Sequence, residues 1–172
     1  MADWYLLPEL PIRLTARGDW LHGDTPLHPR VAILFGRNLV PQADGRFEVV
    51  LGPSRGAVEV ADAAYFVHRL ELRLTDAPDE ALAAVVLHLS DGAVEPLDPT
   101  TLSQAVDNVL YCRLRRHGIP VRCRFTAEQY HQLAWHMGCE PPPAHLLLAG
   151  QSWPIAAEAA IAGQQTSQPT DA

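Results

Sequence analysis

The sequence predicts an α+β fold of two small units, each a mostly antiparallel sheet with a helix, related as an internal repeat. Three observations lead to this prediction. A glycine-to-proline phrase occurs twice, from Gly18 to Pro29 and from Gly92 to Pro99, and a strand-like segment precedes each copy. An apolar stretch at helical spacing follows each copy. The expected hairpins outnumber any plausible crossover connection, which favours antiparallel sheet.

The first unit, residues 1–77, begins with an arm at 1–11 that is rich in aromatic residues and proline. Alternating apolar residues predict short strands at 12–15 and from Trp20. A helix begins at Pro29, because a first helical residue needs no backbone N–H. Asp44-Gly45 is typical of a hairpin turn. Strands are expected at 47–51, 58–60 and 65–74, the last with His68 on the same face as Phe66 and Leu70.

The second unit, residues 78–163, follows a polar break at 76–80. A buried strand is predicted at 82–89 with a turn at 90–92. Asp98 is placed to cap a helix that begins at Pro99. The apolar face of this helix would consist of residues at helical spacing, namely Leu102, Ala105, Val106 and Val109.

A hairpin is predicted next, with strands at 110–116 and 119–125 joined by the two residues His117 and Gly118. Thr126 and Gln129 have capping-box spacing, which predicts a helix start, and Gly138 is expected to end that helix. A last strand is expected at 145–149. Residues 164–172 form a polar tail whose composition is typical of disorder.

Composition and charge limit the possible partners. The chain has 172 residues, of which 48% are hydrophobic, and its net charge is -7, so we expect no nucleic-acid or acidic-membrane partner. All 13 basic residues are arginine. The longest apolar stretch, 81–87, is too short to span a bilayer. The first residues lack a secretory signal pattern, and three irregularly spaced cysteines fit a reducing compartment, so we expect a cytoplasmic protein.

Between about residues 12 and 137 the chain carries a series of short segments: Trp20, Pro26-Leu27, Arg30, Leu34-Phe35, Asp44 to Phe47, Val60 to Tyr65, Leu114-Arg115, Gly118-Ile119, Val121-Arg122 and Tyr130 with Leu133. In order and spacing these segments resemble a bacterial family known as domain of unknown function 1285. The sequence departs from the family pattern at 52–55, where a carboxylate is lost, and at Ala64, where the family has proline. The resemblance implies a two-part α+β fold built from a repeated motif. A role in signal transduction has been suggested for that family, and no established activity comes with the resemblance.

The predicted hairpin at 110–125 carries the main candidate site. With a two-residue turn, Arg113 opposes Arg122, Tyr111 opposes Arg124, and Arg115 opposes a proline, all on one face. Like charges directly opposite each other are destabilising, so these arginines in an acidic protein indicate an anionic partner. That partner would be an anionic small molecule or an acidic protein surface. The alternative is that carboxylates from neighbouring segments neutralise the arginines, or that the arginines are simply solvated.

The same register places Cys112 across from Cys123, which allows a cross-strand disulfide, a pair of metal ligands or, as we favour, two buried thiols. A second group of metal-ligating types comprises His131, His136, Cys139 and His145. Histidines five positions apart on a helix point about 140° apart, and no familiar zinc spacing is present. We therefore expect no metal and no cofactor.

A groove between the two units is the other candidate site, with Trp20, His22, Arg30 and Asp62 as its residues. His22 with Asp19, Asp24 or Asp62 could support acid–base chemistry. Aspartates at turns, however, commonly bond their own backbone.

We favour a non-enzymatic cytoplasmic binding or regulatory protein over two alternatives. One alternative is a small metal-dependent or acid–base hydrolase that uses His22 or the late histidines. The other is a structural module that dimerises through the N-terminal arm and the apolar strand 82–89.

Overall fold

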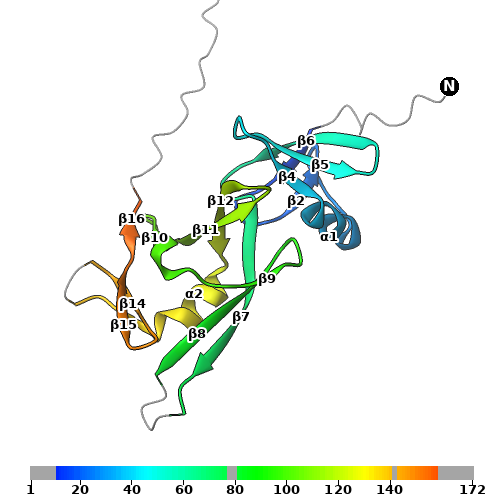
Figure 1. Ribbon diagram of the computed structural model, residues 1–172. Coiled ribbons are helices and arrows are strands. Elements are labelled where there is room, and N and C mark those ends of the chain that lie inside the picture. Colours follow the sequence, from blue (N-terminus) through cyan, green and yellow to red (C-terminus); the bar gives the residue numbers. More distant parts are fainter. Residues whose placement is uncertain (1–10, 77–80, 141–142, 159–172) are drawn as a thin grey trace, which may run out of the picture.

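A computed structural model describes residues 11–76, 81–140 and 143–158 (Figure 1). These residues form a mostly β architecture of three sheets with two α-helices. The predicted arm lies outside the described residues except for Pro11, and the predicted tail lies outside them entirely. In the described part of the chain, no helix has the length and apolar character needed to cross a membrane.

A six-stranded sheet is built from the first part of the chain, with strand order β3-β2-β1-β6-β5-β4. Its strands are β1 (Ile12–Leu14), β2 (Trp20–His22), β3 (Thr25–Pro26), β4 (Leu39–Pro41), β5 (Phe47–Leu51) and β6 (Ser54–Val60). Helix α1 (Pro29–Arg37) begins at the predicted proline and packs Phe35 edge-on against Trp20, with ring centroids 5.7 Å apart. The hairpin predicted at Asp44-Gly45 joins β4 to β5.

A seven-stranded sheet forms the centre of the molecule, with strand order β16-β10-β11-β12-β7-β8-β9. Its strands are β7 (Tyr65–Leu74), β8 (Leu82–Leu89), β9 (Val94–Pro96), β10 (Ser103–Gln104), β11 (Leu110–Arg116), β12 (Ile119–Phe125) and β16 (Ala156–Ala157). Helix α2 (Ala127–Ala134) packs against β7 and β12. The ladders β1–β6, β10–β16 and β7–β12 are parallel, and the remaining ladders of the three sheets are antiparallel. The prediction of mostly antiparallel sheet is therefore confirmed.

A small third sheet follows α2 in the chain. It lies on the side of the seven-stranded sheet away from α1 (Figure 1). Its strands are β13 (Met137–Gly138), β14 (His145–Leu148) and β15 (Gln151–Pro154). The strand predicted at 145–149 is β14. Gly138 lies in β13, so the prediction that it ends α2 directly is wrong by a few residues.

One continuous core joins the three sheets. It includes Leu14 and Trp20 from the first sheet, Leu87 and Cys123 from the second, and Leu146 from the third. Besides this core, a hydrogen bond and a close backbone approach join the first sheet and α1 to the second sheet. The Tyr65 hydroxyl donates a hydrogen bond to the Leu39 carbonyl at 2.9 Å. A Cβ at Gly36 of α1 would lie only 3.0 Å from the Ser90 carbonyl oxygen, so a side chain there would push the helix away.

The helix predicted from Pro99 does not form. Asp98 does cap this segment, since its side chain accepts a hydrogen bond from the Thr100 N–H at 3.0 Å. The helical segment η1 (Pro99–Thr101), however, is a single 3-10 turn, and β10 follows it. The chain instead turns at Asn108, whose φ is 64°, and Val106 is 80% exposed rather than part of an apolar face.

The alternation predicted for 65–74 fails at His68. A β-bulge interrupts the β7–β8 ladder between Val67 and Arg69, and His68 is exposed rather than on the buried face of Phe66 and Leu70. A bulge shifts the side-chain alternation by one residue, so a regular period could not place this histidine correctly.

The internal repeat is not confirmed. Both copies of the glycine-to-proline phrase follow a hairpin strand and end in a proline-started helical segment, but α1 has nine residues and η1 has three. The division at residue 77 stays a prediction. Strand β7, from the predicted first unit, pairs with β8 and β12 of the predicted second unit.

Candidate functional site: the arginine face of the β11–β12 hairpin

The hairpin β11–β12 has the register expected from the sequence. Arg113 pairs with Arg122, Tyr111 with Arg124, and Arg115 with Pro120. The turn residues His117 and Gly118 have φ values of 50° and 78°, the sign that two-residue hairpin turns require. We call the side chains on this side of the hairpin the arginine face: Tyr111, Arg113, Arg115, Arg122 and Arg124.

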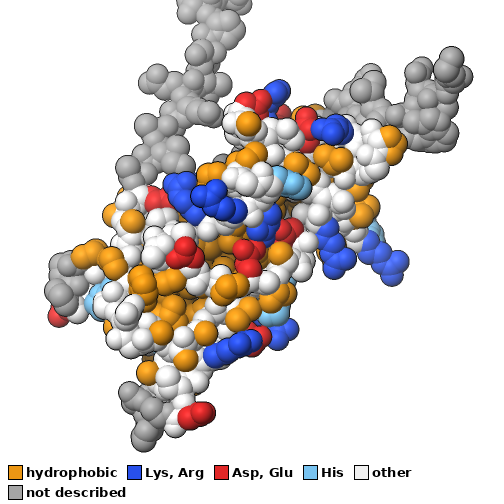
Figure 2. Space-filling model, viewed as in Figure 1, with side chains coloured by type: hydrophobic (Ala, Val, Ile, Leu, Met, Phe, Trp, Pro, Cys, Tyr) orange, Lys and Arg blue, Asp and Glu red, His pale blue; other side chains and the backbone are white. Residues whose placement is uncertain are grey.

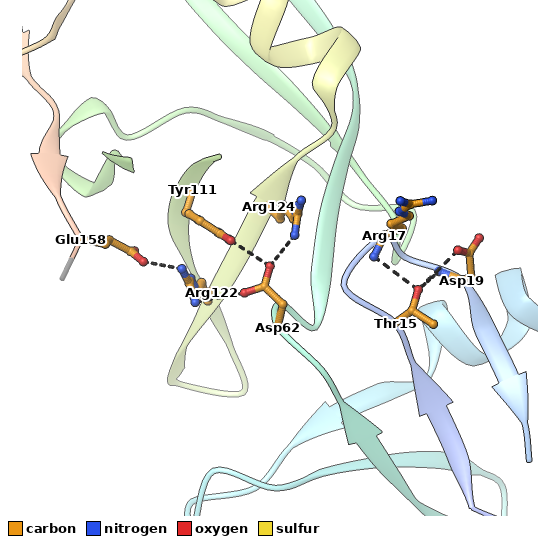
Figure 3. Close-up of polar contacts among 8 residues, drawn as sticks. All are labelled: Thr15, Arg17, Asp19, Asp62, Tyr111, Arg122, Arg124 and Glu158. Carbon is orange, nitrogen blue, oxygen red and sulfur yellow. Dashed lines mark hydrogen bonds and ion pairs between the residues drawn. The ribbon is translucent and has the colours of Figure 1, made fainter. Parts of the chain in front are cut away.

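Asp62, in the connection between β6 and β7, is the acceptor at the centre of the arginine face (Figure 3). Its carboxylate accepts hydrogen bonds from Arg122 Nη1 at 3.1 Å, Arg124 Nη1 at 2.8 Å and the Tyr111 hydroxyl at 2.8 Å. The parallel β7–β12 ladder, which pairs Tyr65 with Cys123, brings Asp62 to this place. Asp62 therefore pairs with two arginines that the hairpin alone would leave facing solvent, and its single charge balances one of them.

Tyr111 is buried, although the alternation had placed it on an open face. The pKa of Tyr111 is raised to about 12, first by burial and then by the hydrogen bond to the Asp62 carboxylate, while Arg122 and Arg124 oppose the shift. The ring of Tyr111 also supports Arg122, whose guanidinium carbon lies 3.6 Å from the ring centroid. This geometry is that of a cation–π contact.

Glu158, just after β16, is the second carboxylate on the arginine face (Figure 3). It forms an ion pair with Arg122 Nη2 and accepts a hydrogen bond from Ser103 Oγ at 2.6 Å. Strand β16 holds Glu158 in place, because it pairs in parallel with β10 beside Ser103. Arg122 is thus fixed from two sides by carboxylates that are distant from it in sequence.

Arg116, at the end of β11, forms a separate charge cluster that the sequence analysis missed. It donates to Asp91 and Glu95, each at 2.7 Å, and lies over the ring of Tyr65. Burial lowers the pKa of Arg116, but the hydrogen bonds to Glu95 and Asp91 outweigh that effect and the net shift is upward. The carboxylates come from the β8–β9 hairpin, so this cluster fixes the two hairpins to each other.

Arg113 and Arg115 remain exposed. Within residues 11–76, 81–140 and 143–158, neither has a carboxylate within ion-pair distance. Arg115 donates to the Gly118 carbonyl at 3.2 Å, and Arg113 forms no hydrogen bond within that part of the chain. The expectation of neutralising carboxylates therefore holds for Arg122 and Arg124 and does not hold for Arg113.

A polar cleft of about 540 Å³ lies beside these side chains. Its lining includes Ser103, Arg113, Arg122 and Glu158, and strand β16 forms one wall. A second cavity of about 400 Å³ adjoins the cleft, since Thr101 and Arg113 line both.

Comparison with known proteins bears on the fold. No family model matches the sequence, and no curated protein matches it. A DUF1285 family protein from Silicibacter pomeroyi DSS-3 superposes with a TM-score of 0.64 at 16% identity, over 86% of this chain and 80% of the other. A DUF1285 family protein from Shewanella baltica OS155 gives a TM-score of 0.54 at 20% identity, over 73% of this chain and 91% of the other. The chain has a DUF1285-like fold. The resemblance read from the sequence is thus confirmed for the fold.

The groove candidates have different surroundings in this DUF1285-like fold. Trp20 is buried in the core, and Arg30 is exposed on α1. Asp62 belongs to the arginine face. His22 lies in β2, and its Nε2 is buried without a hydrogen-bond partner among the described residues. The groove with all four residues stays a prediction, with Trp20 in the core and Asp62 paired with arginines of the hairpin.

The proposed acid–base pairs are also not formed. Asp19 lies in a turn in which its backbone N–H donates to Thr15 Oγ1 at 3.1 Å and its carboxylate accepts from the same hydroxyl at 3.4 Å (Figure 3). Asp24 pairs with Arg13. Each aspartate thus has a local or structural partner, as expected for aspartate at turns.

The cysteines and histidines show no metal-binding arrangement. Cys112 and Cys123 are register partners, and both are buried free thiols, which agrees with the favoured interpretation. Burial raises the pKa of the Cys123 thiol well above its usual value. In the described part of the chain, no three His, Cys, Asp or Glu side chains are close enough together to hold a metal ion.

Proposed function

We propose that this protein is a non-enzymatic binding or regulatory protein of the cytoplasm that recognises an anionic small molecule in the polar cleft, with Arg113 as the anchoring side chain. The observation that carries the proposal is the contrast across the hairpin. Arg122 is held by Asp62 and Glu158, whereas its register partner Arg113 lines the cleft without a carboxylate among the described residues.

The charge balance of the site supports this role. A guanidinium presents a planar set of donors that matches a carboxylate or a phosphate, and it stays charged at any physiological pH. The chain as a whole carries a net charge of -7, so an unpaired arginine at a cavity is not explained by a general excess of basic residues. A signalling role would follow if binding altered the β10–β16 edge, which forms one wall of the cleft.

The test is calorimetric titration of the purified protein with inorganic phosphate and with succinate. Arg113→Ala should weaken binding at least tenfold, while Arg113→Lys should retain part of it because the charge remains. Arg55→Ala is the matched control, since Arg55 is an exposed arginine on the six-stranded sheet. Unchanged affinity in Arg113→Ala, or an equal loss in Arg55→Ala, would show that the proposed site is wrong.

An acidic protein surface is the other anionic partner expected from the sequence. A third titration with an acidic peptide separates the two. Saturable binding of the peptide with no binding of either small anion would favour the protein surface and count against the cleft.

A further inference from the structure

The cavity next to the polar cleft differs from it in chemistry. Its volume is about 400 Å³, and buried apolar side chains form its floor, among them Leu87, Leu97 and Leu114. Two prolines, Pro96 and Pro120, are exposed at its edge. On the face drawn in Figure 2, hydrophobic surface shows between arginine side chains and carboxylates.

Two arginines and two carboxylates line this apolar cavity, and they differ in their partners. Glu95 forms an ion pair with Arg116, whereas Asp98 accepts hydrogen bonds from Thr100 and keeps its negative charge. The two arginines that line it, Arg113 and Arg115, have no carboxylate partner in the described ranges. An apolar floor with guanidinium donors at its edge is complementary to a molecule that has an apolar body and one anionic end.

We infer that the apolar cavity and the polar cleft form one site for an amphipathic monocarboxylate. The carboxylate binds Arg113, which lines both cavities, and the hydrocarbon part lies against Leu87, Leu97 and Leu114. This inference rests on the proposed function, because it uses the same anchoring arginine, and it adds the chemical class of the ligand.

Glu158 supports a carboxylate rather than a more highly charged group at the anionic end. Ser103 and Arg122 donate to the Glu158 carboxylate, which adds a fixed negative charge to the wall of the cleft. Repulsion by Glu158 should make a multiply charged phosphate bind the cleft more weakly than a single carboxylate at Arg113.

The test is a chain-length series of straight-chain carboxylates, from acetate to decanoate, titrated into the full-length protein. Burial of a methylene group favours binding, so the affinity should rise roughly two- to fourfold per added methylene until the cavity is full. The matching primary alcohols should bind at least tenfold more weakly, because they lack the charge that pairs with Arg113. Arg113→Ala should remove this preference for the acid, and Arg55→Ala should not.

Three results would overturn this inference, and the first of them leaves the proposed function standing. An affinity that does not depend on chain length, together with loss of succinate binding in Arg113→Ala, would overturn the amphipathic ligand and leave the anion site standing. No binding of phosphate, succinate or any carboxylate would overturn both. Length-dependent binding that Arg113→Ala leaves unchanged would place the ligand elsewhere and also overturn the inference.

Discussion

Arg113 and Arg122 lie directly opposite each other across the β11–β12 ladder, yet only Arg122 is neutralised. Like-charge pairs at facing positions cost stability unless a counter-charge is present. Asp62 and Glu158 provide that counter-charge for one member of the pair. The consequence is that the arginine face divides into a structural part at Arg122 and Arg124 and an open part at Arg113.

Removal of Asp62 should destabilise the protein strongly. Asp62→Ala leaves Arg122 and Arg124 without their shared acceptor in a partly buried site, where Asp62 is only 12% exposed. Loss of one member of a buried charge network costs about 2 to 4 kcal/mol in the free energy of unfolding. Urea denaturation followed by circular dichroism measures this cost.

Asp24→Ala is the matched control for that experiment. Asp24 also pairs with an arginine, but its side chain is 99% exposed, so its loss should cost less than about 0.5 kcal/mol. Equal effects of the two substitutions would contradict a structural role for Asp62.

The register of this hairpin was predictable from sequence because it depends on local chemistry. His117-Gly118 tolerates positive φ at both turn positions, and a two-residue turn fixes every facing pair that follows. The alternation of Cys112, Leu114 and Arg113 then assigned the faces.

The carboxylates of the site could not be predicted in the same way. Asp62 reaches Arg122 through the parallel β7–β12 ladder, and Glu158 reaches it through the parallel β10–β16 ladder. Parallel pairing joins segments that are distant in sequence and leaves no turn signal between them.

The missing helix after Pro99 has a different cause. Apolar spacing predicts a helix there, but the segment turns at Asn108, a residue type that accepts positive φ readily.

Removal of the Glu158 carboxylate should strengthen anion binding at the cleft. Glu158→Gln retains a similar shape but releases one side of the Arg122 guanidinium and removes a negative charge from the cleft wall. The affinity for succinate should rise several-fold, since two arginines then face the ligand. Calorimetry on both proteins measures the change, and weaker binding in Glu158→Gln would mean that Glu158 helps to build the site instead of competing for it.

Only one of the three cysteines should react rapidly in the folded protein. Cys139 is exposed, whereas Cys112 and Cys123 are buried. The raised pKa of Cys123 also leaves less of the reactive thiolate at pH 8. Ellman's reagent should therefore titrate one thiol quickly in native protein and three in denaturant. Cys139→Ser should abolish the fast reaction; a persistent fast thiol in that variant would show that the hairpin opens readily.

Alkaline pH should weaken the contribution of Tyr111 to stability. The pKa of Tyr111 is raised to about 12 in the folded protein, compared with about 10 for an unperturbed tyrosine. Between these values the unfolded chain loses the proton and the folded chain keeps it, so the contribution is complete below about pH 10 and decreases as the pH rises toward 12. The stability difference between wild type and Tyr111→Phe should shrink over this range. A difference that stays constant would mean that the pKa of Tyr111 is not raised in the folded protein.

Gln129 should matter more than Thr126 for the attachment of α2, contrary to the capping box expected from their spacing. The Thr126 side chain makes no capping hydrogen bond. Gln129 is 3% exposed, and its Oε1 accepts a hydrogen bond from the Leu70 backbone N–H at 3.1 Å, next to the bulge of β7.

Gln129→Leu leaves that buried N–H without an acceptor and should cost about 1 to 3 kcal/mol in the free energy of unfolding. Thr126→Ala, which would cost about 1 kcal/mol at a true N-cap, should have almost no effect. Urea denaturation of both variants measures these losses of stability. A larger loss for Thr126→Ala would support the capping box and a minor role for Gln129.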